Sequence, residues 1–279
     1  MIGPGWQREW NRRRRSRAAR AQREQRAAAD RLRHRRLAWI GALVLGVVAA
    51  IAAVVALGSR AGTGQARAPH DPAAVGAVTR LLSGIPQSGT TLGNPAAAVT
   101  ITEYADLVCP VCAVHATTTE AALIARYVRG GQVKLVLRGL ETASHSHNHA
   151  EYVNTMGDVR SAGLQHRAWD YAELAFYEQP QTIGGQAAEL TPYITSGYLQ
   201  GLGAQVPGLD TSAWQAHATD AALRAAVATD AHSAAGLGIN GTPTLLVSGP
   251  RGTIQYDRNG TESVVPTLAR LGELISQVR

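Results

Sequence analysis

Cysteine and phenylalanine are scarce in this chain, which has two cysteines and a single phenylalanine among 279 residues. Two cysteines are too few for a small domain held together by several disulfides, or for a zinc site made of four thiolates. Because aromatic residues make up only 5%, the core must rely on Leu, Val, Ile and Ala. Hydrophobic residues at 45% and charged residues at 17% exclude a wholly disordered chain, and the length suits one or two domains.

Acidic residues are fewer than basic ones, 20 against 27, and this imbalance is confined to one end of the chain. Residues 1–36 contain thirteen Arg and three acids, a net charge of +10, whereas the remaining residues carry 14 basic and 17 acidic groups, a net charge of −3. The sequence therefore predicts an Arg-rich tail over 1–36 that is attracted to anionic lipid headgroups. We do not expect nucleic acid as its partner, because only Trp6 and Trp10 accompany the arginines and no binding fold surrounds them.

Charge is absent from the next 21 residues, 37–57. A helix of this length spans roughly 31 Å, which matches the hydrocarbon core of a bilayer. Because the arginines concentrate on its N-terminal side, the positive-inside rule places residues 1–36 in the cytoplasm and residues 58–279 outside. A cleaved signal peptide is the alternative, although the apolar stretch and its leader are longer than usual. We expect an uncleaved single-pass signal anchor in the cell membrane, followed by a linker over 58–95 with a short helix at 72–83.

Both cysteines lie in one motif, Cys109-Pro-Val-Cys112. A β-branched strand is expected at 99–104 before it, a helix at 113–129 after it, and a second strand at 133–137. Such a βαβ context favours a redox pair over half of a zinc site. A purely structural disulfide, or two unrelated thiols, is the alternative.

The chemistry of thiol–disulfide exchange needs a thiolate, and the first turn of a helix stabilises one through its unpaired N–H groups. Pro110 suits that turn, because the N–H that it lacks has no partner there. We therefore expect Cys109 to be the exposed nucleophile and Cys112 the more buried resolving thiol. Val111, the second residue between the cysteines, could supply an apolar contact for unfolded substrates.

Residues 101–112, ITEYADLVCPVC, resemble the DsbA-like thioredoxin-fold proteins of bacterial envelopes. The runs GINGTPTL at 238–245 and WDYAELAF at 169–176 fit the same family, and the resemblance covers roughly residues 85–279. It implies an α/β thioredoxin-like fold over 96–279, with an α-helical domain inserted at about 142–236. The sequence agrees with this fold, because residues 148–236 contain no convincing strand. Apolar spacing predicts helices in the insertion near 149–162, 165–178, 186–200, 211–218 and 220–235. After the insertion, the sequence predicts two strands at 244–248 and 253–257 and a helix at 263–278.

The resemblance also assigns roles to individual residues. Pro243 would be the cis-proline beside the cysteines, and Thr242 and Pro243 would contact a substrate peptide added as a strand; an ordinary loop proline is the alternative. Glu103 would be a buried acid that assists proton transfer or tunes the resolving thiol, with Lys134 considered as its charge partner. The alternative for Glu103 is an exposed position on an edge strand. Pro-Val departs from the family, which more often has an aromatic residue or His second.

Histidines form the other notable cluster, at His145, His147 and His149. They could bind zinc or copper, but we favour a polar loop that opens the helical insertion, and we expect no metal site. His115 is expected on the helix surface.

These observations predict a membrane-anchored thiol–disulfide oxidoreductase that acts on exported proteins, most simply as a disulfide-forming oxidase. It would need no cofactor beyond the Cys109–Cys112 disulfide, and a quinone-linked membrane protein of the DsbB or vitamin-K-epoxide-reductase-like type would reoxidise it. Two alternatives stay open. The same site could work as a reductase or isomerase, because the direction depends on reduction potentials. The chain could instead be a non-catalytic envelope scaffold or metal-binding module that uses the histidine run.

Overall fold

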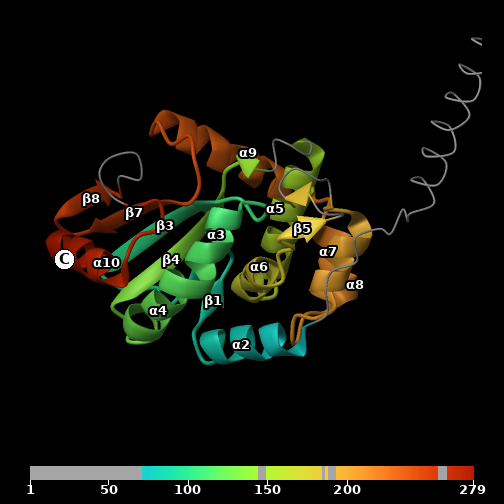
Figure 1. Cartoon of the computed structure of the whole chain (residues 1–279), viewed down its shortest axis with the longest axis horizontal. Coiled ribbons are helices and arrows are strands. Elements are labelled where there is room, and N and C mark those ends of the chain that lie inside the picture. The colour runs from blue at the N-terminus through green and yellow to red at the C-terminus, as the bar shows by residue number, and fades with distance from the viewer. Residues whose placement is uncertain (1–70, 144–148, 184–185, 188–192, 257–262) are drawn as a thin grey trace, which may run out of the picture. The chain divides into compact units, whose positions relative to one another are not determined.

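The computed structural model describes residues 71–279 except 144–148, 184–185, 188–192 and 257–262 (Figure 1). The expected tail at 1–36 and anchor at 37–57 lie outside these residues, and so do His145 and His147. Within the described part of the chain, every helix is too short or too polar to cross a bilayer. The membrane anchor therefore stays a prediction.

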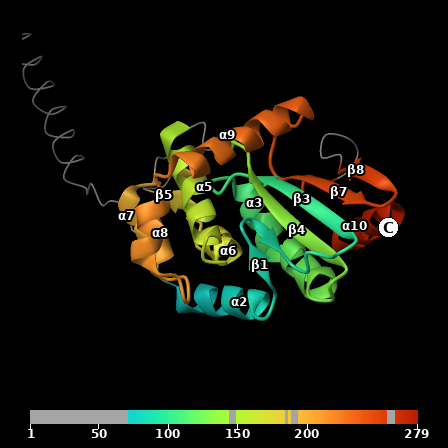
Figure 2. The same ribbon diagram turned by 180° about the vertical axis from the view of Figure 1, so that it is seen from behind.

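A six-stranded mixed sheet forms the centre of the fold, in the order β1-β2-β4-β3-β7-β8 (Figures 1 and 2). The central strands β3 and β4 run parallel, and all other neighbours are antiparallel. β3 is buried along almost its whole length, as expected for a strand with neighbours on both sides and helices over it. The strands are β1 (Gln87–Ser88), β2 (Thr91–Leu92), β3 (Val99–Ala105), β4 (Val133–Gly139), β7 (Thr244–Gly249) and β8 (Gly252–Gln255).

One long helix joins β3 to β4, and it alternates between α-helical and π-helical turns. Its segments are α3 (Pro110–His115), η1 (Ala116–Glu120), α4 (Ala121–Leu123) and η2 (Ile124–Val128), and the residues at their junctions all keep helical backbone angles. The terminal helix α10 (Leu268–Val278) packs against β7 and α4, and α2 (Pro72–Leu82) packs against α6 of the insertion.

An insertion follows β4 and returns to the sheet at β7. It holds α5 (His149–Gly163), α6 (Ala168–Tyr177), α7 (Ser196–Gly203), α8 (Thr211–His217) and α9 (Ala221–Gly236). Asp210 is the N-cap of α8, since its side chain accepts hydrogen bonds from the N–H groups of Ser212 and Ala213. The described helices and strands thus give a thioredoxin-like α/β fold with a helical insertion after the second long strand.

Two pairs of short strands were not expected. Residues 87–92, which lie within the segment predicted to be linker, form β1 and β2 at one edge of the sheet. Within the insertion, β5 (Thr182–Ile183) and β6 (Gln186–Ala187) form a separate two-stranded sheet, so the expectation of no strand in 148–236 was wrong. Each strand is two residues long, too short to show an alternating pattern in the sequence.

The insertion is fixed to the sheet at the end of β4. A Cβ atom on Gly139 would lie 2.7 Å from the Tyr152 hydroxyl and 2.9 Å from Met156 Cγ, so α5 can approach β4 this closely only because residue 139 is glycine. On α9, the buried Asp230 forms ion pairs with Arg138 of β4, at 2.7 Å, and with Arg160 of α5. The Gly139 N–H also donates to Asp230, at 3.1 Å. Asp230 therefore ties one strand and two helices together.

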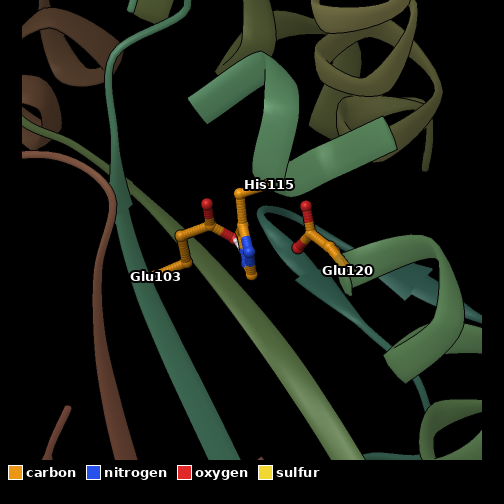
Figure 3. Close-up of side chains that lie close together, drawn as sticks. All are labelled: Glu103, His115 and Glu120. Carbon is orange, nitrogen blue, oxygen red and sulfur yellow. Dashed lines mark ion pairs between the residues drawn. The ribbon is translucent and has the colours of Figure 1, made fainter. Parts of the chain in front are cut away.

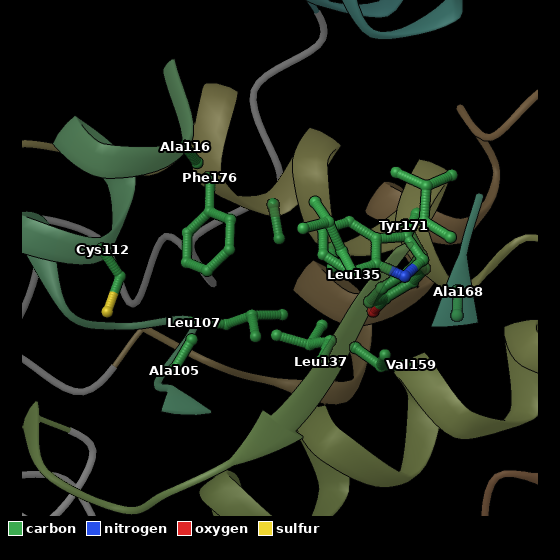
Figure 4. Packing of buried hydrophobic residues seen from close by; sticks show 14 of the residues in the cluster. Ala105, Leu107, Cys112, Ala116, Leu135, Leu137, Val159, Ala168, Tyr171 and Phe176 are labelled. Atoms are coloured by element: carbon green, nitrogen blue, oxygen red, sulfur yellow. The ribbon is translucent and has the colours of Figure 1, made fainter. Parts of the chain in front are cut away.

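One hydrophobic cluster joins the sheet to the insertion. Cys112 belongs to it, close to Ala105 and Leu107 at the end of β3 and to Phe176 of α6 (Figure 4). The second cysteine thus lies inside the core, at the place where the insertion covers the sheet.

Candidate active site

Cys109 ends the turn after β3 and is the N-cap of α3. Pro110 occupies the first turn, where its missing N–H costs nothing, as the sequence predicts. Both cysteines are free thiols in this structure. Cys109 is only 7% exposed, so the expectation of an exposed nucleophile was wrong, because the Thr242–Pro243 loop lies against its sulfur atom. Cys112, at 0%, is the more buried of the two, as expected.

The two thiols have opposite electrostatic environments. A hydrogen bond from the Cys112 side chain is the largest cause that lowers the pKa of Cys109, to about 6, with further hydrogen bonds from the Thr242 side chain and from the backbone of Cys112 and Val111. Burial opposes this shift. Burial also raises the pKa of Cys112 well above its ordinary value, and the nearby Cys109 and Glu103 raise it further. At neutral pH, Cys109 is therefore the thiolate and Cys112 the thiol, which suits attack at Cys109.

The loop before β7 lies directly beside Cys109. The peptide bond between Thr242 and Pro243 is cis. Cys109 Sγ is 3.8 Å from the carbonyl O of Thr242, to which the thiol can donate. Thr242 and Pro243 are both buried in this structure.

A hydrogen-bond network holds this loop against the cysteine turn. The buried Asp106 accepts from the N–H groups of Val108, at 3.0 Å, and Thr142, at 2.8 Å. The Thr142 hydroxyl is in turn 2.6 Å from the Thr242 hydroxyl and 3.4 Å from Asp106 Oδ2. One acid thus positions both sides of the cysteine pair.

Apolar side chains surround the outer surface of the motif. Val111 is half-buried against the main hydrophobic cluster. Val114, one turn further along the helix, is 52% exposed. An exposed valine on the helix that begins after Cys109 offers apolar contact area to an unfolded chain.

Glu103 lies on β3 between β4 and β7 and is 2% exposed, so it is a buried central-strand residue and not one on an edge. Lys134 is not its partner, because the Lys134 ammonium donates to the carbonyl O of Pro95, at 2.8 Å. Burial is the largest cause that raises the pKa of Glu103 well above its ordinary value, followed by the charge of Glu120. At neutral pH, Glu103 is therefore protonated for much of the time and can donate or accept a proton.

Glu103 belongs to a cluster that the sequence did not reveal. His115 of α3 and Glu120 of η1 are fully buried beside it, and their side chains point toward Glu103 from the helix above the strand (Figure 3). His115 Nε2 is 3.9 Å from Glu103 Oε2, and one ligand-type atom of each residue lies within 4.8 Å of those of the other two. Our expectation that His115 is on the helix surface was wrong.

The π-helical stretch explains why these two side chains meet. In an α-helix, residues five apart are rotated by roughly 140°, so His115 and Glu120 would face different directions. A π-helix closes its hydrogen bonds between residues i and i+5, and so brings such a pair to one face. A sequence pattern read with α-helical spacing cannot find this pair.

The histidine run remains largely untested, because His145 and His147 lie outside the described residues. His149 begins α5, and its Nδ1 is 2.7 Å from Glu141 Oε2. Its side chain is 74% exposed. An exposed histidine paired with a carboxylate fits the polar loop that we expected.

A family model described as "Thioredoxin" matches residues 87–260, which is more than half of the chain. The chain belongs to the thioredoxin family. The match includes both cysteines, the cis-proline loop and the helical insertion. None of the curated protein sequences compared with this member of the family matches it.

Solved structures with the same DsbA-like fold include three bacterial proteins. Oxidised BdbD from Bacillus subtilis has a TM-score of 0.55 and 18% identity, covering 70% of this chain and 96% of BdbD. The α-DsbA1 protein of Wolbachia pipientis has a TM-score of 0.50 and 16% identity, covering 71% and 92% of the two chains. DsbA of Chlamydia trachomatis has a TM-score of 0.50 and 14% identity, covering 68% and 89%. At these identities, the similarity shows the thioredoxin-like fold with its insertion.

Proposed function

We propose that this chain is a membrane-anchored thiol–disulfide oxidoreductase that forms disulfides in exported proteins. The observation that carries the proposal is the asymmetry of the pair: Cys109 has a pKa lowered to about 6 and faces the cis-proline loop, whereas Cys112 is buried with a raised pKa. Membership of the thioredoxin family supports thiol–disulfide exchange as the chemistry.

The proposed reaction needs no group beyond the two cysteines. A substrate thiolate attacks Cys109 Sγ, the Cys109–Cys112 bond breaks, and Cys112 leaves with the electron pair and takes up a proton. A second substrate thiolate then attacks the substrate sulfur and releases Cys109 as a thiolate. The substrate loses two electrons and the enzyme gains them, so that the reduced pair must be reoxidised. We propose a quinone-linked membrane protein of the DsbB or vitamin-K-epoxide-reductase-like type for that step.

The roles of the surrounding residues follow from their positions. Pro110 begins the helix that places Cys109, and Val111 offers an apolar contact. Thr242 and Pro243 lie where a substrate backbone would pass beside Cys109. The anchor at 37–57, with residues 1–36 in the cytoplasm, would keep the domain at the outer surface of the membrane.

A second direction of the same chemistry is supported by one observation. The residue before Cys112 is valine, and this position tunes the relative stability of thiolate and disulfide. A reductase or isomerase would use the same cysteines with a lower reduction potential. Equilibration of the pair with glutathione decides between the two directions.

Cys112→Ala tests the proposal, because Cys109 can then form a mixed disulfide that no second thiol resolves. We expect adducts between Cys109 and exported proteins that are released by a reducing agent. The matched control is Cys109→Ala, which leaves only the buried Cys112 and should trap none. If Cys112→Ala yields no adducts while Cys109 still reacts with a small alkylating reagent, the proposed function is wrong.

A further inference from the structure

Four titratable side chains are buried together near Cys112, and the proposed reaction itself uses none of them. Glu173 of α6 joins the cluster already described and is 1% exposed. α6 packs against both α3 and η1, so this carboxyl reaches the cluster from the helical insertion, whereas Glu103 reaches it from the sheet. The cluster thus consists of Glu103, His115, Glu120 and Glu173.

The cluster contains three acids and no permanent cation among the described residues. Groups that influence its members electrostatically are Cys109 and Cys112, the four cluster residues themselves and Tyr177. Burial lowers the pKa of His115, so the imidazole is neutral at neutral pH. Three ionised carboxylates without a cation would repel each other in a medium of low dielectric constant. Protons must therefore reside on the carboxyl groups.

Unpartnered atoms lead to the same conclusion. Oε1 of Glu103, both oxygens of Glu173 and both ring nitrogens of His115 are buried without a hydrogen-bond partner. Once one carboxyl of a pair holds a proton, Glu120 can form hydrogen bonds with both Glu103 and Glu173. The protonated cluster is thus a chain of hydrogen bonds, Glu103–Glu120–Glu173, with the His115 ring beside its first link.

We propose that Glu120 and Glu173 extend Glu103 into a buried proton store, which supplies the proton that Cys112 takes up when the disulfide opens. The inference rests on the proposed function. When the Cys109–Cys112 bond breaks, the Cys112 thiolate takes a proton from the Glu103 carboxyl. Glu120 reprotonates Glu103, and Glu173 reprotonates Glu120. The transfers run in reverse when the disulfide closes.

The outer end of the store lies near solvent. Tyr177 is one turn after Glu173 on α6 and is half-buried. Its pKa is raised first by burial and then by the charges of Glu173 and Glu120. The pKa of Glu173 itself is raised to about 8, chiefly by burial, so this carboxyl holds its proton at neutral pH. A proton lost to Cys112 can therefore be replaced from the side of the insertion, while the Cys109 side is occupied by substrate.

Infrared difference spectroscopy of the full chain, reduced minus oxidised with dithiothreitol as the reductant, tests the store directly. We expect bands of protonated carboxyl groups that change on reduction, and that lose intensity in both E120Q and E173Q. Reduction above about pH 8 should also slow roughly tenfold in each variant. The control is D158N, which removes another buried acid, with a pKa raised to about 7, away from the cluster; its spectrum and rate should match those of the wild type.

The outcomes are separable. If the bands and rates of E120Q and E173Q equal those of the wild type, Glu103 works alone and the proposal is wrong. A stoichiometric metal ion found by elemental analysis, lost in both variants, would also overturn it. Should E120Q fail to fold, E173Q alone decides, because it leaves the active-site helix unchanged. Dithiothreitol reduces the pair whatever the natural substrate is, so failure of the proposed function would be seen in the trapping experiment and not here.

Discussion

Two regions of this molecule bury carboxyl groups at junctions between the sheet and the inserted helices, and they stabilise them differently. Asp230 on α9 has an arginine at each of its two oxygens and a backbone N–H in addition. The cluster of Glu103, Glu120 and Glu173 has no arginine or lysine among the described residues and only the neutral ring of His115. The first arrangement fixes a charge and holds elements together. The second arrangement holds protons, and its buried carboxyl groups lower the stability of the fold. Groups with strongly shifted pKa values that destabilise the fold are typical of sites that exchange protons.

The largest effect should come from breaking the first region. Asp230→Ala leaves Arg138 and Arg160 without their shared partner, and Arg160 is only 15% exposed. We expect the free energy of unfolding to fall by about 3–5 kcal/mol, because uncompensated buried charge is expensive. Urea unfolding would measure this as a lower midpoint with an unchanged slope. A loss below about 1 kcal/mol would show that solvent replaces the aspartate.

Removing a carboxyl group from the second region should raise the free energy of unfolding instead of lowering it. Glu173→Met removes a buried carboxyl whose oxygens lack partners, in exchange for an apolar chain of similar length. We expect the free energy of unfolding to rise by about 1–2 kcal/mol, while thiol exchange slows. Urea unfolding and the rate of disulfide reduction, measured on one preparation, would test this. Destabilisation would mean that Glu173 makes a structural bond after all.

The pH dependence of stability gives a smaller but sharper test. Because the pKa of Glu173 is raised to about 8, the folded protein keeps a proton that the unfolded chain loses near its ordinary value of 4.5. Stability should therefore fall as the pH rises from about 5 to about 8. E173Q should show a flatter profile, measured on the oxidised protein so that the lowered pKa of Cys109 does not add an opposite slope. Equal slopes in both proteins would contradict the raised pKa.

The buried Asp106 differs from both regions, because neutral N–H and hydroxyl donors surround its carboxylate. Thr142→Val removes the hydroxyl that joins Asp106 to Thr242 but keeps the backbone N–H bond. We expect the free energy of unfolding, measured by thermal unfolding, to fall by about 1 kcal/mol. Thr142→Ser is the control and should behave as the wild type. If the two variants behave alike, the hydroxyl does not hold the cis-proline loop.

Much of the fold was predictable because its long elements carry regular patterns. The strand over 99–104 is rich in β-branched residues, and the helix after Cys112 has apolar residues at helical spacing. The strand was therefore placed to within one residue and the helix to within three. The predicted terminal helix at 263–278 begins instead at Leu268, after a segment that includes Pro266. In the insertion, the helix expected at 186–200 is α7, which begins only at Ser196. Short strands such as β1 could not be predicted, because two residues are too few to show the alternation of apolar and polar residues that marks a strand.

The candidate site was predictable in part. The cysteine motif and the residues 242–243 are local in sequence, so a resemblance could identify them, and the cis bond and the buried Glu103 are present. The rest of the cluster could not be predicted for two physical reasons. Glu120 faces inward only because the helix is π-helical there. Glu173 comes from the insertion, and its contact with the sheet is a product of tertiary packing.

The meeting of β3, η1 and α6 has a consequence for how the protein folds. The inserted helices are not a detachable module, because removing them would open the core around Cys112 and leave Glu120 without its neighbour from α6. Sheet and insertion lie in one compact unit and share one apolar cluster. They should accordingly unfold in a single cooperative transition. Transplanting the cysteine motif and its sheet into another scaffold would carry over the nucleophile but leave behind the residues that surround its partner.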